Sequence, residues 1–345
     1  MKVAFIMPTY FDPASVIAGG ERYAYGLAKA VSEKAETTLF TFSDREKILT
    51  DGKLTLRHSK VIFCIGGRAN PFSVNYLKSL EAFDVIHCLQ FKTMVTEMAV
   101  FLGAALKKKI FVTDLAGGTH YCLSRFFPTE KFVNEFLYIS GYNRGLHGWV
   151  RRPFRIIYGG VDTDFFSPLP EKPRGAFLYV GRIFYLKGIH DLIEALPEGA
   201  ALDIVGQCHE SEYLQKLKVM SQGRKISFYD SLPDREVLEK YRTAAAVVLP
   251  SLVDGGFTSA MEAMACATPV LGTRMGSLPE VVKEGVTGLL VDPGDQAALH
   301  EKILFFQKNP DAARVMGQKA RQCVVEQFTW EKTADRCLDA YRSAP

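Results

Sequence analysis

The sequence predicts an α/β protein with two domains, each built on a doubly wound parallel sheet. Short apolar runs alternate with segments of helical periodicity along the whole chain. Most of the runs are continuously apolar, as is typical of parallel strands buried on both faces. The chain has 345 residues, which fits two domains of roughly 150–200 residues better than one core.

The strands of the first domain are predicted from apolar runs separated by helical segments. Glu21–Lys34 and Met94–Leu106 have helical spacing, so the strands on either side of them should be parallel and joined by right-handed crossovers. The predicted strands are Val3–Met7, Thr37–Phe42, Val61–Ile65, Val85–Cys88, Ile110–Thr113, Phe136–Ser140 and Arg155–Tyr158.

A second set of strands follows the Gly-, Pro- and charge-rich stretch GGVDTDFFSPLPEKPRG, whose composition is that of a linker. Its strands are Ala176–Val180, Ala201–Val205, Ile226–Phe228, Ala246–Pro250, Pro269–Gly272 and Gly288–Val291, with helices expected at Gly188–Leu196, Ser211–Met220 and Asp234–Ala244. We therefore expect domains at 1–160 and 161–328. Residues 329–345 should form a last helix that packs back on the first domain.

Composition excludes several classes of protein. Hydrophobic residues make up 48% and charged residues 23%, which is ordinary for a globular protein. A formal charge of +4 is too mild to indicate a nucleic-acid partner. The seven cysteines form no C-x-x-C pair, and there is neither a signal peptide nor an apolar run of ~18 residues, so we expect a cytoplasmic protein. Lys107-Lys108-Lys109 and Arg151-Arg152 leave contact with anionic lipid at the inner membrane surface open, although solvated surface is the simpler interpretation.

Residues that follow strands deserve most weight, because open α/β sheets bind ligands outside the carboxyl ends of their strands. Gly19-Gly20 precedes a helix, where backbone N–H groups can approach an anion, although a plain turn would have the same sequence. Arg182 and Lys187 follow Ala176–Val180. An Arg fork and a mobile Lys suit a phosphate, whereas two solvated surface cations are the alternative.

The segment from Pro250 to Ala265 is the richest in polar candidates. It is predicted to form a strand, a Gly255-Gly256 loop and a helix, which is another natural phosphate cradle. Asp254 and Glu262 could both face the same cleft and accept hydrogen bonds from sugar or ribose hydroxyls. Ser259-x-x-Glu262 also matches a capping box, in which Glu262 would only satisfy a backbone N–H, and the spacing does not decide between these interpretations.

Other chemistries find no support. Asp162-Thr163-Asp164 imitates a D-x-D metal motif but lies in the linker, and no histidine pair has metal-ligand spacing. No P-loop, dinucleotide fingerprint or nucleophile elbow occurs. We therefore expect no metal and no cofactor.

In their order and spacing, these elements resemble family 4 of the retaining glycosyltransferases, which have the GT-B fold of two Rossmann-like domains facing across a cleft. Gly181-Arg182…Lys187-Gly188 is similar to the GR-x4-KG phosphate loop of the family, and Asp254…Glu262 to its Glu-x7-Glu element. Further matches are Gly19-Gly20, Tyr158–Asp162, Glu262–Ala265, Thr268–Val270, Gly276–Glu280 and Gly288–Val291. The resemblance spans both domains and is strongest from Tyr158 onward.

The resemblance implies a role for each matched position. Arg182 and Lys187 would hold the diphosphate of a nucleotide-sugar and stabilise the leaving group without a metal. Glu262 would bind the ribose and Asp254 the donor sugar, while Gly19, Gly20, Gly206, Gly256, Phe257 and Thr258 would line the donor; the base would lie near Gly206 and residues 228–231. Domain closure would exclude water.

Three departures from the family pattern are visible. Asp254 replaces a Glu, and Gly255-Gly256-Phe257 replaces the usual G-F-G order. Where the family often has a histidine after the strand at Ile110–Thr113, this chain has Asp114, with His120 further on. Either residue is a candidate contact to the sugar or acceptor.

The expected function is metal-independent, retaining transfer of a sugar from a UDP-, GDP- or ADP-sugar to a glycan, lipid-linked or small-molecule acceptor. Two alternatives remain open: an epimerase or hydrolase of nucleotide-sugars, and a non-catalytic nucleotide- or glycan-binding protein.

Overall fold

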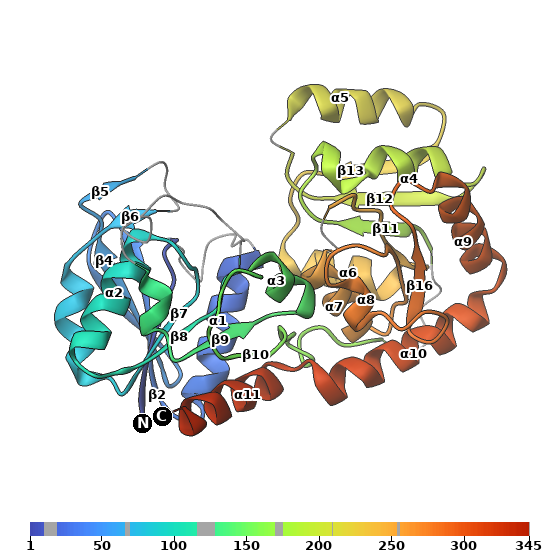
Figure 1. Cartoon of the computed structure of the whole chain (residues 1–345). Coiled ribbons are helices and arrows are strands. Elements are labelled where there is room, and N and C mark those ends of the chain that lie inside the picture. The colour runs from blue at the N-terminus through green and yellow to red at the C-terminus, as the bar shows by residue number, and fades with distance from the viewer. Residues whose placement is uncertain are drawn as a thin grey trace. The chain divides into compact units, whose positions relative to one another are not determined.

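The computed structural model describes residues 1–9, 19–65, 70–115, 128–169, 175–208, 210–253 and 256–344. The chain forms two compact units (Figure 1). Unit 1 consists of residues 1–160 together with 330–345, and unit 2 of residues 161–329. The chain therefore passes from one unit to the other twice, and its last helix belongs to the unit in which the chain begins.

Unit 1 is built on an eight-stranded sheet of order β10-β9-β8-β7-β1-β2-β4-β3, in which only the β3–β4 pair is antiparallel. Because β1 lies in the middle, the chain winds outward in both directions and the strand order reverses between β1 and β7. The strands are β1 (Lys2–Ile6), β2 (Glu36–Ser43), β3 (Lys47–Asp51), β4 (Leu54–Lys60), β7 (Val85–Cys88), β8 (Lys109–Val112), β9 (Glu135–Tyr138) and β10 (Phe154–Ile156); β5 (Phe63–Cys64) and β6 (Pro71–Phe72) form a separate two-stranded pair.

The helices of unit 1 bury one apolar face each. In α1 (Gly19–Ser32) the buried positions Tyr23, Leu27 and Val31 recur at helical spacing. Thr93 begins α2 (Met94–Ala105) by accepting a hydrogen bond from the Thr96 amide, as an N-cap residue does. The remaining helical elements are η1 (Asn75–Ala82), η3 (Thr129–Phe132), α3 (Gly141–Leu146) and α11 (Trp330–Ser343).

The C-terminal helix α11 packs against α1 (Figure 1). Two glycines make room for its first residue, because a Cβ at Gly26 or Gly160 would lie 2.4 Å or 2.7 Å from Trp330. Further along α11, the Tyr341 hydroxyl lies 2.6 Å from Nδ1 of the fully buried His87. Lys109 Nζ donates to the carbonyls of Tyr341 and Ala344 at the end of the helix, where a cation is stabilised by the helix dipole.

Unit 2 is built on a parallel sheet of order β13-β12-β11-β14-β15-β16. Helix α4 packs against α5 and α9, and α7 packs against α6, α8 and α10 (Figure 1). The strands are β11 (Phe177–Val180), β12 (Ala201–Val205), β13 (Lys225–Tyr229), β14 (Val247–Leu249), β15 (Val270–Thr273) and β16 (Gly288–Val291); the helical elements are η4 (Tyr185–Lys187), α4 (Ile189–Ala195), α5 (Ser211–Met220), α6 (Asp234–Thr243), α7 (Phe257–Ala265), α8 (Leu278–Val281), α9 (Gln296–Lys308) and α10 (Pro310–Gln327).

The predicted fold class is confirmed, but the edge of the first sheet was predicted wrongly. The strand expected at 61–65 is reduced to the short β5, and the hairpin of β3 and β4 takes the place at the edge of the sheet. Strand β3 lies at this edge and is largely exposed, so it lacks the continuous apolar run from which buried strands were predicted. Within the described residues, no helix combines the length and apolar character that a bilayer span requires.

A glycine-to-alanine exchange at position 26 should destabilise unit 1. Such an exchange in a helix normally stabilises it by about 0.5–1 kcal/mol. Here the new Cβ would meet the Trp330 ring, which is also held by Gly160 and an edge contact to Tyr23. We expect Gly26→Ala to cost about 1–3 kcal/mol, the usual cost of overpacking. Urea unfolding followed by tryptophan fluorescence measures this, because both tryptophans, Trp149 and Trp330, lie in unit 1.

Gly145→Ala is the matched control, since Gly145 is also helical and a Cβ there would meet no atom within 4 Å. If Gly26→Ala is as stable as this control, the close packing of Trp330 is wrong.

Candidate functional site

The candidate site of unit 2 lies where the strand order of its sheet reverses. Strand β11 begins the sheet in the chain, β12 and β13 extend it in one direction, and β14 pairs with the other side of β11. The connections from β11 to β12 and from β14 to β15 therefore run in opposite directions along the sheet. The crevice outside the carboxyl ends of strands at such a reversal point is where ligands bind in sheets of this kind. Both predicted phosphate elements follow these two strands.

The segment after β11 brings the two predicted cations together. The guanidinium carbon of Arg182 lies 5.3 Å from the centre of the Phe184 ring, and Lys187 Nζ lies 5.5 Å from the same centre. The carbonyl of Arg182 accepts a hydrogen bond from the Tyr179 hydroxyl at 2.8 Å, which fixes the backbone of the turn. Arg182 is exposed, whereas Lys187 is 9% exposed. A lysine so buried is uncommon, so the interpretation of Lys187 as a solvated surface cation is wrong.

The loops after β11 and β14 are joined by backbone contacts. The amide of Leu252 donates to the carbonyl of Leu186 at 2.8 Å. Gly188 has a φ of 65°, and a Cβ there would lie 2.1 Å from the carbonyl oxygen of Pro250. Any other residue at position 188 would therefore push the two loops apart.

Gly206 occupies a similar position at the end of β12. Its φ is 150°, and a Cβ would lie 1.8 Å from the carbonyl oxygen of Gly181. Its amide donates to the carbonyl of Tyr229 at 2.9 Å. The turns after β11 and β12 thus run in direct backbone contact, as the phosphate loop and the predicted base region would require.

Helix α7 directs its amino end to the end of β11. Gly256 is its N-cap residue, with φ of 63° and no side-chain capping hydrogen bond. The Ser259 hydroxyl donates to the carbonyl of Val180 at 2.9 Å, which ties the first turn of the helix to strand β11. The first amides of α7, those of Phe257 and Thr258, therefore begin at the crevice, where the helix dipole favours an anion.

These contacts overturn the capping-box interpretation of Glu262. Ser259 lies inside the helix rather than at its N-cap position, and its hydroxyl is used by Val180. Glu262 is 8% exposed, and its Oε2 accepts a hydrogen bond of 2.7 Å from the hydroxyl of Tyr241 on α6. Burial, and next the neighbouring Glu262 carboxylate, raise the pKa of Tyr241 well above its ordinary value, so this phenol remains a donor.

The other predicted residues lie in unit 1 or outside the described residues. Gly19 and Gly20 are the first residues of α1. Asp114 follows β8 and is 1% exposed. Its Oδ2 lies 2.8 Å from Nε2 of His147, and its Oδ1 accepts from the Phe91 amide at 3.3 Å. Asp254, Gly255 and His120 fall outside the described residues.

The structure thus brings the turn with Arg182 and Lys187, Gly206 and the start of α7 to the carboxyl ends of β11 and β12, with Glu262 one turn further along α7. Sequence reasoning missed two partners, Tyr241 for Glu262 and His147 for Asp114. Tyr241 precedes Glu262 by 21 residues, and strand β9 lies between Asp114 and His147 in the sequence. Local spacing therefore links neither pair. The signal was weak: a Tyr on an amphipathic helix is normally a core residue.

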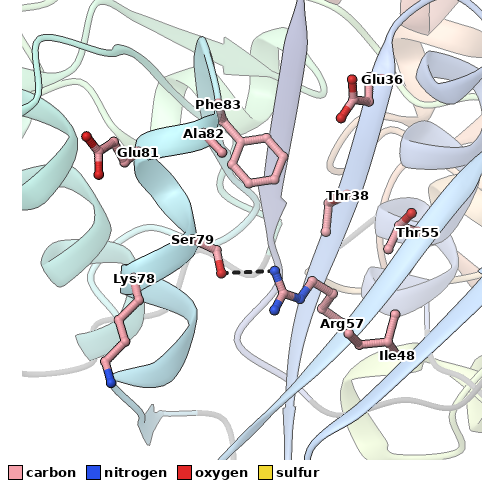
Figure 2. Close-up of a pocket in the computed structure, with 10 residues that line it drawn as sticks. All are labelled: Glu36, Thr38, Ile48, Thr55, Arg57, Lys78, Ser79, Glu81, Ala82 and Phe83. Atoms are coloured by element: carbon pink, nitrogen blue, oxygen red, sulfur yellow. Dashed lines mark hydrogen bonds between the residues drawn. The ribbon is translucent and has the colours of Figure 1, made fainter.

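Unit 1 also contains a cavity of about 700 Å³ that none of the predicted residues lines (Figure 2). It lies between η1 and the first halves of β2 and β4, and Arg57 donates across it to the Ser79 hydroxyl at 2.9 Å. Its lining includes Glu36 and Thr38, near the amino end of β2. The cavity is therefore not at the carboxyl edge, where ligands bind in these sheets.

Removing the Tyr241 hydroxyl should leave a buried carboxylate short of one donor. We expect Tyr241→Phe to lower the free energy of unfolding by about 1.5–3 kcal/mol, as hydrogen bonds to charged groups do. Tyr213→Phe is the control, because the Tyr213 hydroxyl pairs with an imidazole nitrogen of His190 at 3.0 Å and not with a carboxylate, and should cost less. Chemical unfolding monitored by circular dichroism distinguishes the two; equal costs would contradict a charged Glu262.

The C-terminal unit matches a known family profile. The profile described as glycosyl transferases group 1 matches residues 161–323. A glycogen synthase of Mycobacterium tuberculosis is 32% identical over 202 residues, which cover 55% of this chain and 48% of that protein. The chain therefore spans about half the length of the curated relatives that it matches first.

Other similarities extend over both units. An uncharacterized glycosyltransferase of Methanocaldococcus jannaschii is 30% identical over 308 residues, covering 77% of this chain and 76% of that protein. The solved structure of a sucrose-phosphate synthase from Thermosynechococcus elongatus aligns with a TM-score of 0.78 at 21% identity, covering 99% of this chain and 98% of that one. The structural similarity to this synthase shows that the chain has the GT-B fold. Together with the match over both units, it confirms the resemblance drawn from the motifs, and the chain belongs to the glycosyl transferases group 1 family.

Proposed function

We propose that this protein transfers a sugar from a nucleotide-diphosphate sugar to an acceptor hydroxyl, with retention of the anomeric configuration and without a metal. One observation carries the proposal. Arg182 and Lys187 follow β11, and Ser259 ties the first turn of α7 to the end of the same strand, so that two cations and a helix amino end lie at the reversal point of the unit 2 sheet. This combination suits a diphosphate.

In this proposal the two cations supply the electrostatic stabilisation of the reaction. Negative charge develops on the diphosphate as the bond to the sugar breaks, and preformed charges aimed at that position lower the barrier. Lys187 is already buried beside Phe184, so it need not be desolvated when the donor binds. Arg182, on the same loop, is exposed, and its guanidinium group can donate two parallel hydrogen bonds to the phosphate oxygens.

Glu262 is the proposed partner of the ribose hydroxyls. The Tyr241 hydroxyl orients its carboxylate before any ligand arrives, which lowers the cost of ordering the site on binding. Asp254 is the proposed contact to the donor sugar, and Gly256, Phe257 and Thr258 offer backbone amides to it. Gly19 and Gly20 keep the donor-binding role that the family resemblance gives them, and Gly206 the position beside the base.

Unit 1 is the proposed acceptor unit, with Asp114 near the acceptor, and UDP, GDP and ADP are all candidate donors. A glycan, a lipid-linked sugar or a small molecule would suit the acceptor role.

We further propose a cytoplasmic location with peripheral contact to the membrane surface. Lys108 and Lys109 donate to backbone carbonyls of unit 1, so the exposed Arg151 is the better candidate for anionic lipid.

Binding of nucleotides tests the donor site directly. We expect calorimetry with UDP, GDP and ADP, without magnesium, to show binding of at least one of them. Arg182→Ala should weaken that binding about tenfold or more, as loss of a charge-assisted phosphate contact does. Arg235→Ala, on the exposed surface of α6, is the control and should bind as the wild type does. Equal affinity of the Arg182 variant would contradict its role.

Turnover tests the role of Lys187. Glycogen, D-glucose and D-glucose 6-phosphate serve as polymeric, neutral and anionic acceptor probes, with UDP-glucose and ADP-glucose as donors. Lys187→Met keeps the volume of the side chain and removes the charge, so turnover should fall about 10²–10³-fold while the melting temperature changes little. Lys218→Met, an exposed lysine of α5, should change neither. Near-wild-type turnover of Lys187→Met would refute the proposed electrostatic role.

A further inference from the structure

A buried histidine–aspartate pair holds together three segments at the carboxyl edge of the unit 1 sheet. His147 and Asp114 are 7% and 1% exposed. Asp114 follows β8, its Oδ1 accepts a hydrogen bond from the amide of Phe91 after β7, and its Oδ2 lies 2.8 Å from Nε2 of His147, which follows α3. His147 Nδ1 lies 3.0 Å from the carbonyl oxygen of Asn143 within the same turn.

The partners of His147 require it to keep a proton on each side. The Asn143 carbonyl can only accept a hydrogen bond, so Nδ1 must carry a hydrogen. Nε2 faces a carboxylate oxygen, and that contact exists only if a proton lies between the two atoms, as in an imidazolium–carboxylate pair. Loss of this proton would set two lone pairs against each other at 2.8 Å.

The groups around the pair raise the pKa of His147 above its ordinary value. Burial lowers the pKa of His147, but the hydrogen bonds to Asp114 and to the Asn143 carbonyl raise it more, so the net shift is upward from 6.5. Lys92, after β7, opposes the shift. Arg144 of α3 donates to the His147 carbonyl at 3.1 Å. Tyr138 of β9 has its ring centre 5.6 Å away, and burial raises the pKa of its phenol to about 12, so it stays neutral.

The same edge carries polar atoms that nothing in the described part of the chain satisfies. The Tyr138 hydroxyl and Asn143 Oδ1 are buried and have no hydrogen-bond partner among the described residues. A buried polar atom without a partner costs about 1–3 kcal/mol, so such atoms normally meet water or a ligand. Both residues adjoin His147, and the first two segments that Asp114 joins follow β7 and β8, beside the reversal of strand order between β1 and β7.

We propose that His147 and Asp114 form a proton-dependent positioning pair for the acceptor. When the shared proton is present, the pair holds the segments after β7 and β8 and helix α3 in the arrangement that receives the acceptor hydroxyl. When the proton is lost, these segments separate. This inference rests on the proposed glycosyl transfer, with unit 1 as the acceptor unit. Neither residue needs to touch the reacting atoms. The direction of the pH dependence follows from the raised pKa of His147. The arrangement is intact below this pKa and is lost as the pH rises through it.

The first test is the pH dependence of acceptor use, measured with the probe acceptor that gives the highest turnover. From about pH 6 to about pH 9, KM for this acceptor should rise about tenfold, whereas the nucleotide Kd, a property of unit 2, stays constant. His147→Gln keeps an amide N–H for Asp114 but cannot titrate, so its KM should stay low over the whole range. His147→Leu should have a high KM at every pH. His300→Gln is the control, because it removes a histidine on α9 of unit 2, and its KM should depend on pH as that of the wild type does.

A flat wild-type profile, or a wild-type KM in His147→Leu, would overturn the proposal. NMR titration of the His147 imidazole is a second readout that needs no turnover. A pKa above 6.5 that falls in Asp114→Asn supports the pair, and a pKa of 6.5 or below overturns it. The Trp149 emission should also change with this titration in the wild type but not in His147→Gln. If both spectroscopic results hold and no acceptor is used, the glycosyl-transfer proposal fails and the pair stands as a pH-dependent contact alone.

Discussion

All strands of the unit 2 sheet run parallel, so all their carboxyl ends lie on one edge, and the rest of the candidate site depends on this constraint. The strand order places β11 beside β14, although 66 residues lie between these two strands in the sequence. Local spacing therefore could not reveal that they are neighbours. Because the chain goes on from β11 to β12 and from β14 to β15, the two connections run in opposite directions along the sheet and leave the carboxyl edge between them as the place where ligands bind. A cationic loop and a helix amino end thus come to the same edge of the sheet.

Glycines then set how closely these loops approach. At Gly188 and Gly206 the backbone of a neighbouring loop occupies the place of a side chain, and both residues have φ values that other residues rarely adopt. The consequence is geometric: Arg182 and Lys187 lie on a turn that is fixed at both ends, by Gly206 behind it and by Pro250 beside it. Long cationic side chains normally lose much conformational freedom on binding an anion, and a fixed turn on which both cations lie near the Phe184 ring reduces that loss.

The sequence was sufficient for features that a single segment encodes, and insufficient for features that two distant segments share. Continuous apolar runs predicted the buried strands, and the segment 181–188 predicted a cationic loop, because each is local. The hairpin of β3 and β4 escaped because an edge strand is exposed and carries no apolar run. The start of α7 at Gly256 excludes the capping-box interpretation of Glu262, which local spacing could not do, since Ser259-x-x-Glu262 fits a capping box whether or not the helix begins there.

Two buried histidines of unit 1 have pKa values shifted in opposite directions, and they differ in the chemistry of their partners. His87 is fully buried between the hydroxyls of Tyr341 and Thr113, at 2.6 Å and 2.8 Å. A hydroxyl can donate or accept, so a neutral imidazole is satisfied on both sides, and burial lowers the pKa of His87 to about 3. His147 meets a carbonyl and a carboxylate, which only accept, and the pKa moves the other way. His87 therefore joins β7, the segment after β8 and α11 through an imidazole that stays neutral, while the contact of His147 depends on a shared proton. Unit 1 thus contains one polar contact beneath its C-terminal helix that needs no added proton and another at its carboxyl edge that does, and the second is the contact that we propose to position the acceptor.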